Sequence, residues 1–147
     1  MTGDSNEKNE PYILQKGCLD NVDADVLKVA HHGSGTSTTQ AFLDKIDPEY
    51  AIISVGAGNK HGHPEAGLME RLNNYTDVKP DKDYDKISQI YRTDEDGDVI
   101  VQVSSTGVLN VISSNNADRN KTQTAIVLVV HHERVVLFAI TKEQYEE

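Results

Sequence analysis

The amino-acid sequence predicts a mixed α/β fold, a parallel sheet with an antiparallel appendage. Two segments of the first half each run from an apolar strand through a loop into a helix, an order that favours parallel strands covered by helices. The second half alternates short apolar segments with tight-turn sequences, as antiparallel strands do. A length of 147 residues, 37% hydrophobic and 26% charged, suits a single domain with a buried core.

The first strand–loop–helix unit follows a polar segment in which Pro11 suits the first turn of a helix. Residues 25–30 (DVLKVA) predict a buried strand that runs directly into the loop sequence HHGS. Residues 38–46 predict a helix, because its apolar residues share one face. Asp47 and Pro48 end that helix, since proline restricts the residue before it and cannot continue the hydrogen bonding.

The second unit repeats the pattern. Residues 50–55 (YAIISV) predict an apolar strand, and residues 56–62 predict a loop. Pro64 then opens a predicted helix with Leu68, Met69 and Leu72 on one side.

The second half predicts strands joined by turns. After a polar loop at 77–86, residues 90–93, 99–104 and 108–112 predict short strands, with tight turns at 94–97 and 105–107. Residues 114–123 predict a polar linker. Residues 124–130 and 134–140 predict a terminal hairpin, followed by a short helix, whose placement the sequence leaves open.

Composition limits the function classes. The net charge of -10 argues against a nucleic-acid binder that works by bulk positive charge. The single Cys18 excludes an internal disulfide framework and a cysteine-based zinc ribbon. The longest apolar run, residues 125–130, is strand-sized, so we expect no membrane segment. We also expect no signal peptide, because the first residues have neither a basic flank nor an apolar stretch.

Four of the six histidines follow the two predicted parallel strands. They form the pairs His31-His32 and His61-Gly62-His63, and Asp4 is an available carboxylate before the first strand. Sites in open α/β sheets lie at the carboxyl ends of the strands, and imidazole with carboxylate suits zinc-like metals. The pattern indicates a metal site, and the alternative that these histidines merely cap strand ends stays open.

Residues 33–38 (GSGTST) form a small-residue loop before a helix, which can receive a phosphate oxygen on its free N–H groups. Ser34 and Thr36 are the candidate substrate-binding residues there. A structural loop without a ligand is the simpler interpretation, and the absence of G-x-x-x-x-G-K-[ST] excludes a nucleotide P-loop.

Three stretches together resemble a metallo-β-lactamase-fold hydrolase domain: TGD at 2–4, DVLKVAHHGSGTS at 25–37 and YAIISVGAGNKHGHPEAGLMERL at 50–72. More narrowly, they are similar to the soluble C-terminal domain of ComEC-type DNA-internalisation competence proteins. Residues 90–101 (IYRTDEDGDVIV) resemble the strand pair that closes that domain.

The resemblance implies an αββα sandwich that holds up to two divalent metal ions, zinc or manganese. Asp4 would match the bridging carboxylate and His63 the terminal histidine ligand, while His31 and His32 would be the catalytic candidates above the metals. Which of those two histidines acts stays open. The implied chemistry is metal-activated water attacking a phosphodiester, such as single-stranded DNA.

One departure from the family pattern is large: the first metal motif, H-x-H-x-D-H, does not occur in the chain. We therefore expect residues 1–113 to be the C-terminal half of such a domain, 114–123 a linker, and 124–147 the hairpin with its short terminal helix. The expected partners are a missing N-terminal half or a second copy of the chain. The compartment stays open: cytoplasmic if the chain is free-standing, membrane-associated or extracytoplasmic if it is part of a ComEC-like protein.

Two function hypotheses follow. The first is a metal-dependent phosphodiesterase or nuclease related to competence DNA uptake, incomplete as this chain. The second is a catalytically inactive half domain that acts in assembly or interaction. A hydrolase of a small ester or lactam is a weaker third interpretation, because the substrate depends on pocket residues.

Overall fold

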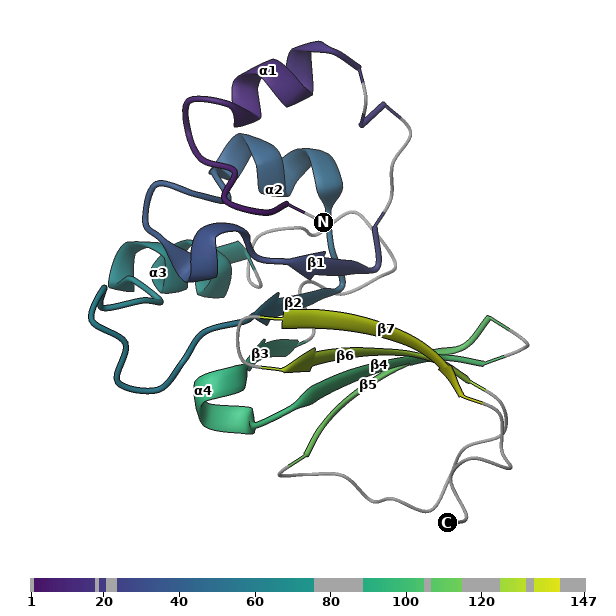
Figure 1. Cartoon of the computed structure of the whole chain (residues 1–147). Coiled ribbons are helices and arrows are strands. Elements are labelled where there is room, and N and C mark those ends of the chain that lie inside the picture. Colours follow the sequence, from purple (N-terminus) through teal and green to yellow (C-terminus); the bar gives the residue numbers. More distant parts are fainter. Residues whose placement is uncertain are drawn as a thin grey trace.

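The computed structural model describes residues 2–17, 19–20, 24–75, 89–104 and 107–114, together with the backbone of two further strands, 125–131 and 134–140. Three layers follow one another: helices, a parallel sheet and an antiparallel sheet (Figure 1). This arrangement confirms the predicted α/β class. The αββα sandwich of the metallo-β-lactamase fold stays a prediction.

The helices occupy the positions that the sequence indicates. Helix α1 is Glu10–Gln15, with Pro11 in its first turn, and α2 is Gln40–Ile46. The side chain of Thr39 caps α2 by accepting the Phe42 N–H, and Asp47 ends it in a left-handed conformation with φ 50°. Helix α3 is Ala66–Tyr75, so it begins two residues after Pro64 rather than at it.

The parallel sheet has the order β1-β2-β3, formed by Val26–Lys28, Tyr50–Ile53 and Gln89–Arg92. In register, Leu27 pairs with Ala51, and Ala51 pairs with Ile90. The short segment η1, Ala30–Gly33, follows β1 almost directly. The two predicted strand–loop–helix units are confirmed, and their strands end at the same edge of the sheet.

One expectation for the second half was wrong. Residues 90–93 were expected in the antiparallel series, but β3 pairs in parallel with β2, and Thr93–Asp96 form the one-turn helix α4 instead of a tight turn. The Thr93 hydroxyl explains the placement, because it donates to Val55 O and accepts the Val55 N–H, both at 2.8 Å. Asp96 also accepts the Arg92 N–H at 2.7 Å, which closes the turn.

The antiparallel sheet has the order β5-β4-β6-β7, formed by Leu109–Ser113, Val99–Val103, Ala125–His131 and Arg134–Ile140. The predicted hairpin at 124–140 is confirmed as β6 and β7. The sequence left the position of this hairpin open. In the structure β6 pairs with β4, and Val101 lies opposite Leu128. The hairpin thus extends the same sheet as β4 and β5.

The parallel sheet is buried on both faces. One apolar cluster joins it to the helices and includes the buried side chains of Leu27, Val29, Phe42, Leu43, Ala51, Ile53, Leu68 and Leu72. The opposite cluster joins it to the antiparallel sheet through Ile52, Tyr91, Val99, Val101 and Val111. Alternation along β2 assigns Ala51 and Ile53 to one face and Ile52 to the other.

Several expectations lie outside the described residues: the polar loop at 77–86, the linker from 115 to 123 and the terminal helix after 140. None of the helices in the described ranges is long and apolar enough to span a bilayer.

Candidate functional site

Two strand-end loops and the N-terminal turn meet around one cavity. The cavity has a volume of about 180 Å³ and lies at the carboxyl edge of the parallel sheet. Its lining combines four imidazoles, one carboxylate and one side-chain amide with two residues that have no polar side chain. The lining residues are Asp4, His31, His32, Val55, Gly56, Asn59, His61 and His63. The structure therefore brings together the four predicted metal and catalytic residues, Asp4, His31, His32 and His63.

The first histidine pair has an unusual backbone. His31 and His32 both adopt left-handed conformations, with φ 49° and 53°, and Gly33 follows with φ 91°. Left-handed backbone in residues other than glycine costs of order 1–3 kcal/mol each and persists where the surroundings over-determine it. Here the His31 N–H donates to Gly3 O at 3.0 Å, which fixes the loop against the N-terminal turn.

The two neighbouring imidazoles differ in their partners. His32 Nδ1 lies 2.8 Å from Ser54 O. Because a carbonyl oxygen can only accept, the neutral ring carries its proton on Nδ1 and keeps the lone pair on Nε2. The Nδ1 atom of His31 is buried and has no hydrogen-bond partner among the described residues. His32 is thus held in one tautomer, whereas His31 presents an unsatisfied buried ring nitrogen.

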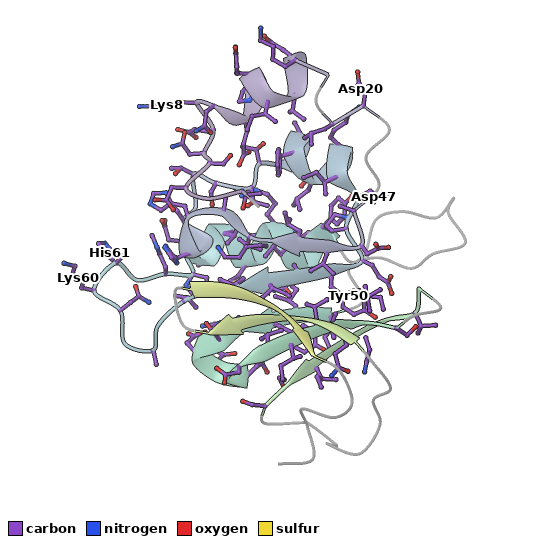
Figure 2. The ribbon with its side chains drawn as sticks, turned by 45° about the vertical axis from the view of Figure 1, so that its right-hand side comes forward. Lys8, Asp20, Asp47, Tyr50, Lys60 and His61 are labelled. Atoms are coloured by element: carbon purple, nitrogen blue, oxygen red, sulfur yellow. The ribbon has the colours of Figure 1, made fainter. Side chains whose placement is uncertain are left out.

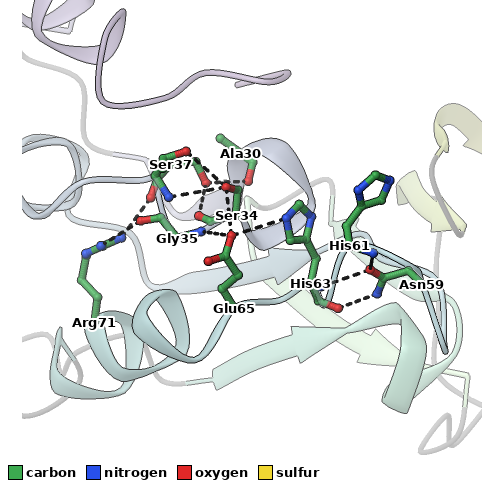
Figure 3. Close-up of polar contacts among 10 residues, drawn as sticks. Ala30, Ser34, Gly35, Ser37, Asn59, His61, His63, Glu65 and Arg71 are labelled. Carbon is green, nitrogen blue, oxygen red and sulfur yellow. Dashed lines mark hydrogen bonds and ion pairs between the residues drawn. The ribbon is translucent and has the colours of Figure 1, made fainter.

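The second histidine pair is organised by Asn59 (Figure 3). The Asn59 side-chain oxygen accepts the N–H groups of His61 at 3.1 Å and His63 at 3.0 Å. Its amide nitrogen donates to His63 O at 2.6 Å and to Gly56 O at 3.1 Å. Figure 2 shows Lys60 and His61 at the outer end of this loop, on the opposite side of the molecule from Asp47 and Tyr50.

The imidazoles of the two loops lie close together. The ring centroids of His31 and His63 are 5.7 Å apart in an edge-to-face arrangement, and those of His61 and His63 are also 5.7 Å apart. Burial lowers the pKa of His63 below its ordinary value; Glu65 opposes this shift and the neighbouring histidines add to it. His63 is therefore a neutral imidazole near pH 7, the form that binds metals.

Glu65 connects the two loops. Its Oε1 accepts the Gly35 N–H at 3.0 Å and the Ser34 hydroxyl at 3.3 Å, and lies 3.5 Å from His63 Nε2 (Figure 3). The Gly35 N–H, with smaller contributions from Ser34 and the nearby histidines, lowers the pKa of this carboxyl below its ordinary value. Glu65 is thus a carboxylate beside the imidazole of His63.

The predicted phosphate loop has a different local role. Ser34 is buried and Thr36 is exposed, and neither lines the cavity. The guanidinium of Arg71 donates to the carbonyls of Gly35, Ser37 and Thr38 at 3.0 to 3.2 Å, as drawn in part in Figure 3. The Gly35 N–H is occupied by Glu65, as described above. Substrate binding by Ser34 and Thr36 stays a prediction, and the structure gives it no free N–H at Gly35.

Asp4 reaches the cavity from the N-terminal turn. The turn is fixed by the Ser5 N–H, which donates to Thr2 O at 3.1 Å, and by the Thr2 hydroxyl, which donates to Lys28 O at 2.6 Å. Lys28 is a nearby cation; burial lowers its pKa below the ordinary value, and Asp4 opposes this shift.

The donor types at the cavity fit a zinc-like metal, but their arrangement is incomplete. Imidazole and carboxylate are the usual ligands of such ions, and the unsatisfied buried nitrogen of His31 has the chemistry of a ligand atom. Within the described residues, however, no group of three or more His, Cys, Asp or Glu side chains converges on one ion position. A closed metal shell at this cavity therefore requires further donors.

Sequence reasoning missed several residues of the site. His61 lines the cavity and was noted only as the neighbour of His63; Asn59 and Glu65 were not singled out. The position of Glu65, two residues after His63, was an available signal. Nothing in the sequence indicates that Asn59 bonds to the backbone of both histidines, because that depends on how the loop folds.

The fold and the cavity define an α/β protein with a histidine-lined site at the strand ends. The chain is 32% identical over 99 residues to "ComE operon protein 3" of Bacillus subtilis (strain 168), a match covering 67% of this chain and 11% of that protein. It is 43% identical over 75 residues to "Recombination protein 2" of Haemophilus influenzae, covering 51% of this chain and 9% of the relative. "Competence protein ComA" of Neisseria gonorrhoeae is 38% identical over 72 residues, covering 49% and 10%.

These relatives support the predicted relationship to ComEC-type competence proteins. The chain spans about a tenth of the length of each of them. No protein-family model and no solved structure matches the chain.

Proposed function

We propose that the chain is part of a metal-dependent hydrolase that acts on phosphodiesters, such as single-stranded DNA, in competence DNA uptake. The observation that carries the proposal is the single cavity shared by Asp4, His31, His32 and His63 at the carboxyl edge of the parallel sheet. The name of the relative from Neisseria gonorrhoeae supports the connection to competence, and the donor types at the cavity support the metal-dependent chemistry.

Asp4 and His63 are the residues that would contribute ligands to a zinc or manganese ion, and His31 and His32 are the catalytic candidates beside them. Such an ion supplies activated water, whose pKa falls to about 7. Two residues of this chain orient the histidines. The Ser54 carbonyl fixes the tautomer of His32, and the Glu65 carboxylate lies 3.5 Å from His63 Nε2. Because the described donors do not close a shell, we propose that further donors come from another part of the full protein or from a partner chain.

The charge of the chain supports a requirement for cations. With a net charge of -10, the protein repels a phosphodiester unless bound metal ions offset the repulsion. Binding of a single-stranded oligonucleotide is therefore expected only with a divalent cation present.

A zinc titration by calorimetry tests the metal proposal. The wild-type chain is expected to bind zinc or manganese weakly, and Asp4→Ala and His63→Ala are each expected to reduce affinity about tenfold or more, because each removes a donor. Lys60→Ala is the matched control, since Lys60 is exposed on the same loop and is not among the residues that line the cavity. Equal binding by wild type and both donor variants would contradict the assignment.

The second candidate function is an inactive half domain that acts in assembly. The donor set is incomplete among the residues that the structure describes, and this favours the assembly function. Light scattering separates the two interpretations: a stable dimer or a complex with a partner, without metal binding, supports assembly. A monomer that binds metal and cleaves an oligonucleotide when the missing donors are supplied supports the hydrolase.

A further inference from the structure

A fully buried carboxylate lies outside the cavity. Glu10, in the first turn of α1, is 0% exposed. Its Oε1 accepts the Thr38 N–H at 2.7 Å, and its Oε2 accepts the Thr39 N–H at 2.8 Å. Short charge-assisted bonds of this kind are what allow a carboxylate to stay buried. Glu10 therefore accepts hydrogen bonds from the two N–H groups just before α2. The sequence had suggested that a phosphate oxygen could bind at this loop.

The same carboxylate is connected to the turn that carries Asp4. The hydroxyl of Ser5, itself buried, donates to Glu10 Oε1 at 3.4 Å and lies 3.3 Å from Asn9 Oδ1. The Glu7 N–H donates to Thr36 O at 2.7 Å, a second bond between this segment and the loop. Asp4 thus directly precedes a residue whose hydroxyl contacts the buried carboxylate.

The loop side of the connection leads to the histidine pair. Thr38 has φ 51°, a left-handed conformation that is a genuine outlier for a β-branched residue. Its Oγ1 accepts the Ala30 N–H at 3.2 Å, and Ala30 immediately precedes His31. A strained residue of this kind persists only where its bonds over-determine it, and the Glu10 carboxylate supplies one of those bonds.

We propose that Glu10 is a positioning residue that couples the Asp4 turn to the His31-His32 loop. Ser5, which follows Asp4, contacts Glu10, and Glu10 accepts the Thr38 N–H. Thr38 in turn accepts the N–H of Ala30, which precedes His31. The His31 N–H donates to Gly3 O, which closes a continuous series of contacts. Two of the three segments that line the cavity, the Asp4 turn and the His31-His32 loop, are therefore connected by one carboxylate that does not line it. The coupling belongs to the metal-free chain and is independent of the proposed function.

The variant Glu10→Gln tests the coupling. Glutamine has one oxygen in place of two, so one of the Thr38 and Thr39 N–H groups loses its acceptor. Amide exchange is expected to become about tenfold faster in both segments 2–9 and 30–39, measured by hydrogen–deuterium exchange in the metal-free chain. The ring resonances of His31 and His32 are expected to shift in nitrogen-15 spectra.

Tyr75→Phe is the matched control. The Tyr75 hydroxyl donates to Asp47 Oδ1 at 2.6 Å and lies 3.1 Å from Leu43 O, at the other end of α2. Its loss is expected to lower the melting temperature without changing exchange in segments 2–9 and 30–39. If Glu10→Gln and Tyr75→Phe change exchange alike, or if Glu10→Gln leaves both segments and the histidine resonances unchanged, the positioning role is wrong.

Wild-type protein gives a second measurement if Glu10→Gln fails to fold. In low concentrations of urea, the amide protons of His31 and Thr38 are expected to exchange through one shared opening. Separate openings with different urea dependence would overturn the coupling.

Discussion

The side-chain amide of Asn59 makes four hydrogen bonds around the second histidine pair. Its oxygen accepts two backbone N–H groups and its nitrogen donates to two carbonyls, so one side chain closes the loop between β2 and α3. Side-chain amides act in this way in turns because they copy backbone hydrogen bonding. The imidazoles of His61 and His63 are neighbours as a consequence.

Asn59→Ala is expected to destabilise the protein by about 2 kcal/mol, because several part-buried backbone groups lose a partner. Urea denaturation measures the loss, and the ring resonances of His61 and His63 are expected to move. Lys60→Ala, one residue away and exposed, is expected to stay within about 0.5 kcal/mol of the wild type. A loss no larger for Asn59→Ala than for Lys60→Ala would show that the loop does not depend on the amide.

Residues with distinctive chemistry could be predicted from the sequence, and those that position them could not. Asp4, His31, His32 and His63 were predicted because their types and order are informative, and they share the cavity. The roles of Glu65 and Glu10 depend on contacts with residues about 30 positions away. No local pattern reports such pairings, so a carboxylate in a polar segment is indistinguishable from a solvated one.

At the scale of elements, the loops after β1 and β2 are in direct contact. A Cβ on Gly33, whose φ is 91°, would lie 2.6 Å from Pro64 Cβ and 2.9 Å from Pro64 Cα. The Glu65 N–H donates to Gly33 O at 2.9 Å across the same contact. Only glycine satisfies both the backbone conformation and the space.

Gly33→Ala is therefore expected to cost about 2–4 kcal/mol, from left-handed strain together with the collision with Pro64. Chemical denaturation checks the value. The matched control is Gly56→Ala in the neighbouring loop, where a Cβ would meet nothing within 4 Å. Similar stabilities for the two variants would contradict the close approach of the loops.

Prediction of the elements succeeded where local signals were strong. Prolines and apolar faces located α1 and α2, and apolar segments located β1 and β2. The segment of β3 was recognised as a strand, but its neighbour was assigned wrongly. A short apolar segment does not specify which strand it pairs with; here the Thr93 hydroxyl bonds to Val55 and favours β2.

The whole molecule depends on the contact between its two sheets. Tyr91 of β3 is buried there, and its hydroxyl lies 2.9 Å from the Val111 carbonyl of β5 and 2.8 Å from Gln89 Oε1. This is a polar connection within an otherwise apolar cluster. Burial, followed by the effects of Tyr50 and Asp96, raises the pKa of Tyr91 above its ordinary value.

Tyr91→Phe is expected to lower the free energy of unfolding by about 1–2 kcal/mol near pH 8, because the Val111 carbonyl loses its donor. The difference from wild type is expected to shrink above about pH 10. The unfolded tyrosine releases its proton there while the buried one keeps it, so the stability that Tyr91 contributes is complete below its unfolded pKa and lost as pH rises through the higher folded pKa. Urea midpoints across that range measure the effect.

Tyr12→Phe is the control, because the Tyr12 side chain is 61% exposed. It is expected to change neither the free energy of unfolding near pH 8 nor its dependence on pH. If the difference in the free energy of unfolding between wild type and Tyr91→Phe stays constant as pH rises, the result would contradict burial of a neutral hydroxyl between the two sheets.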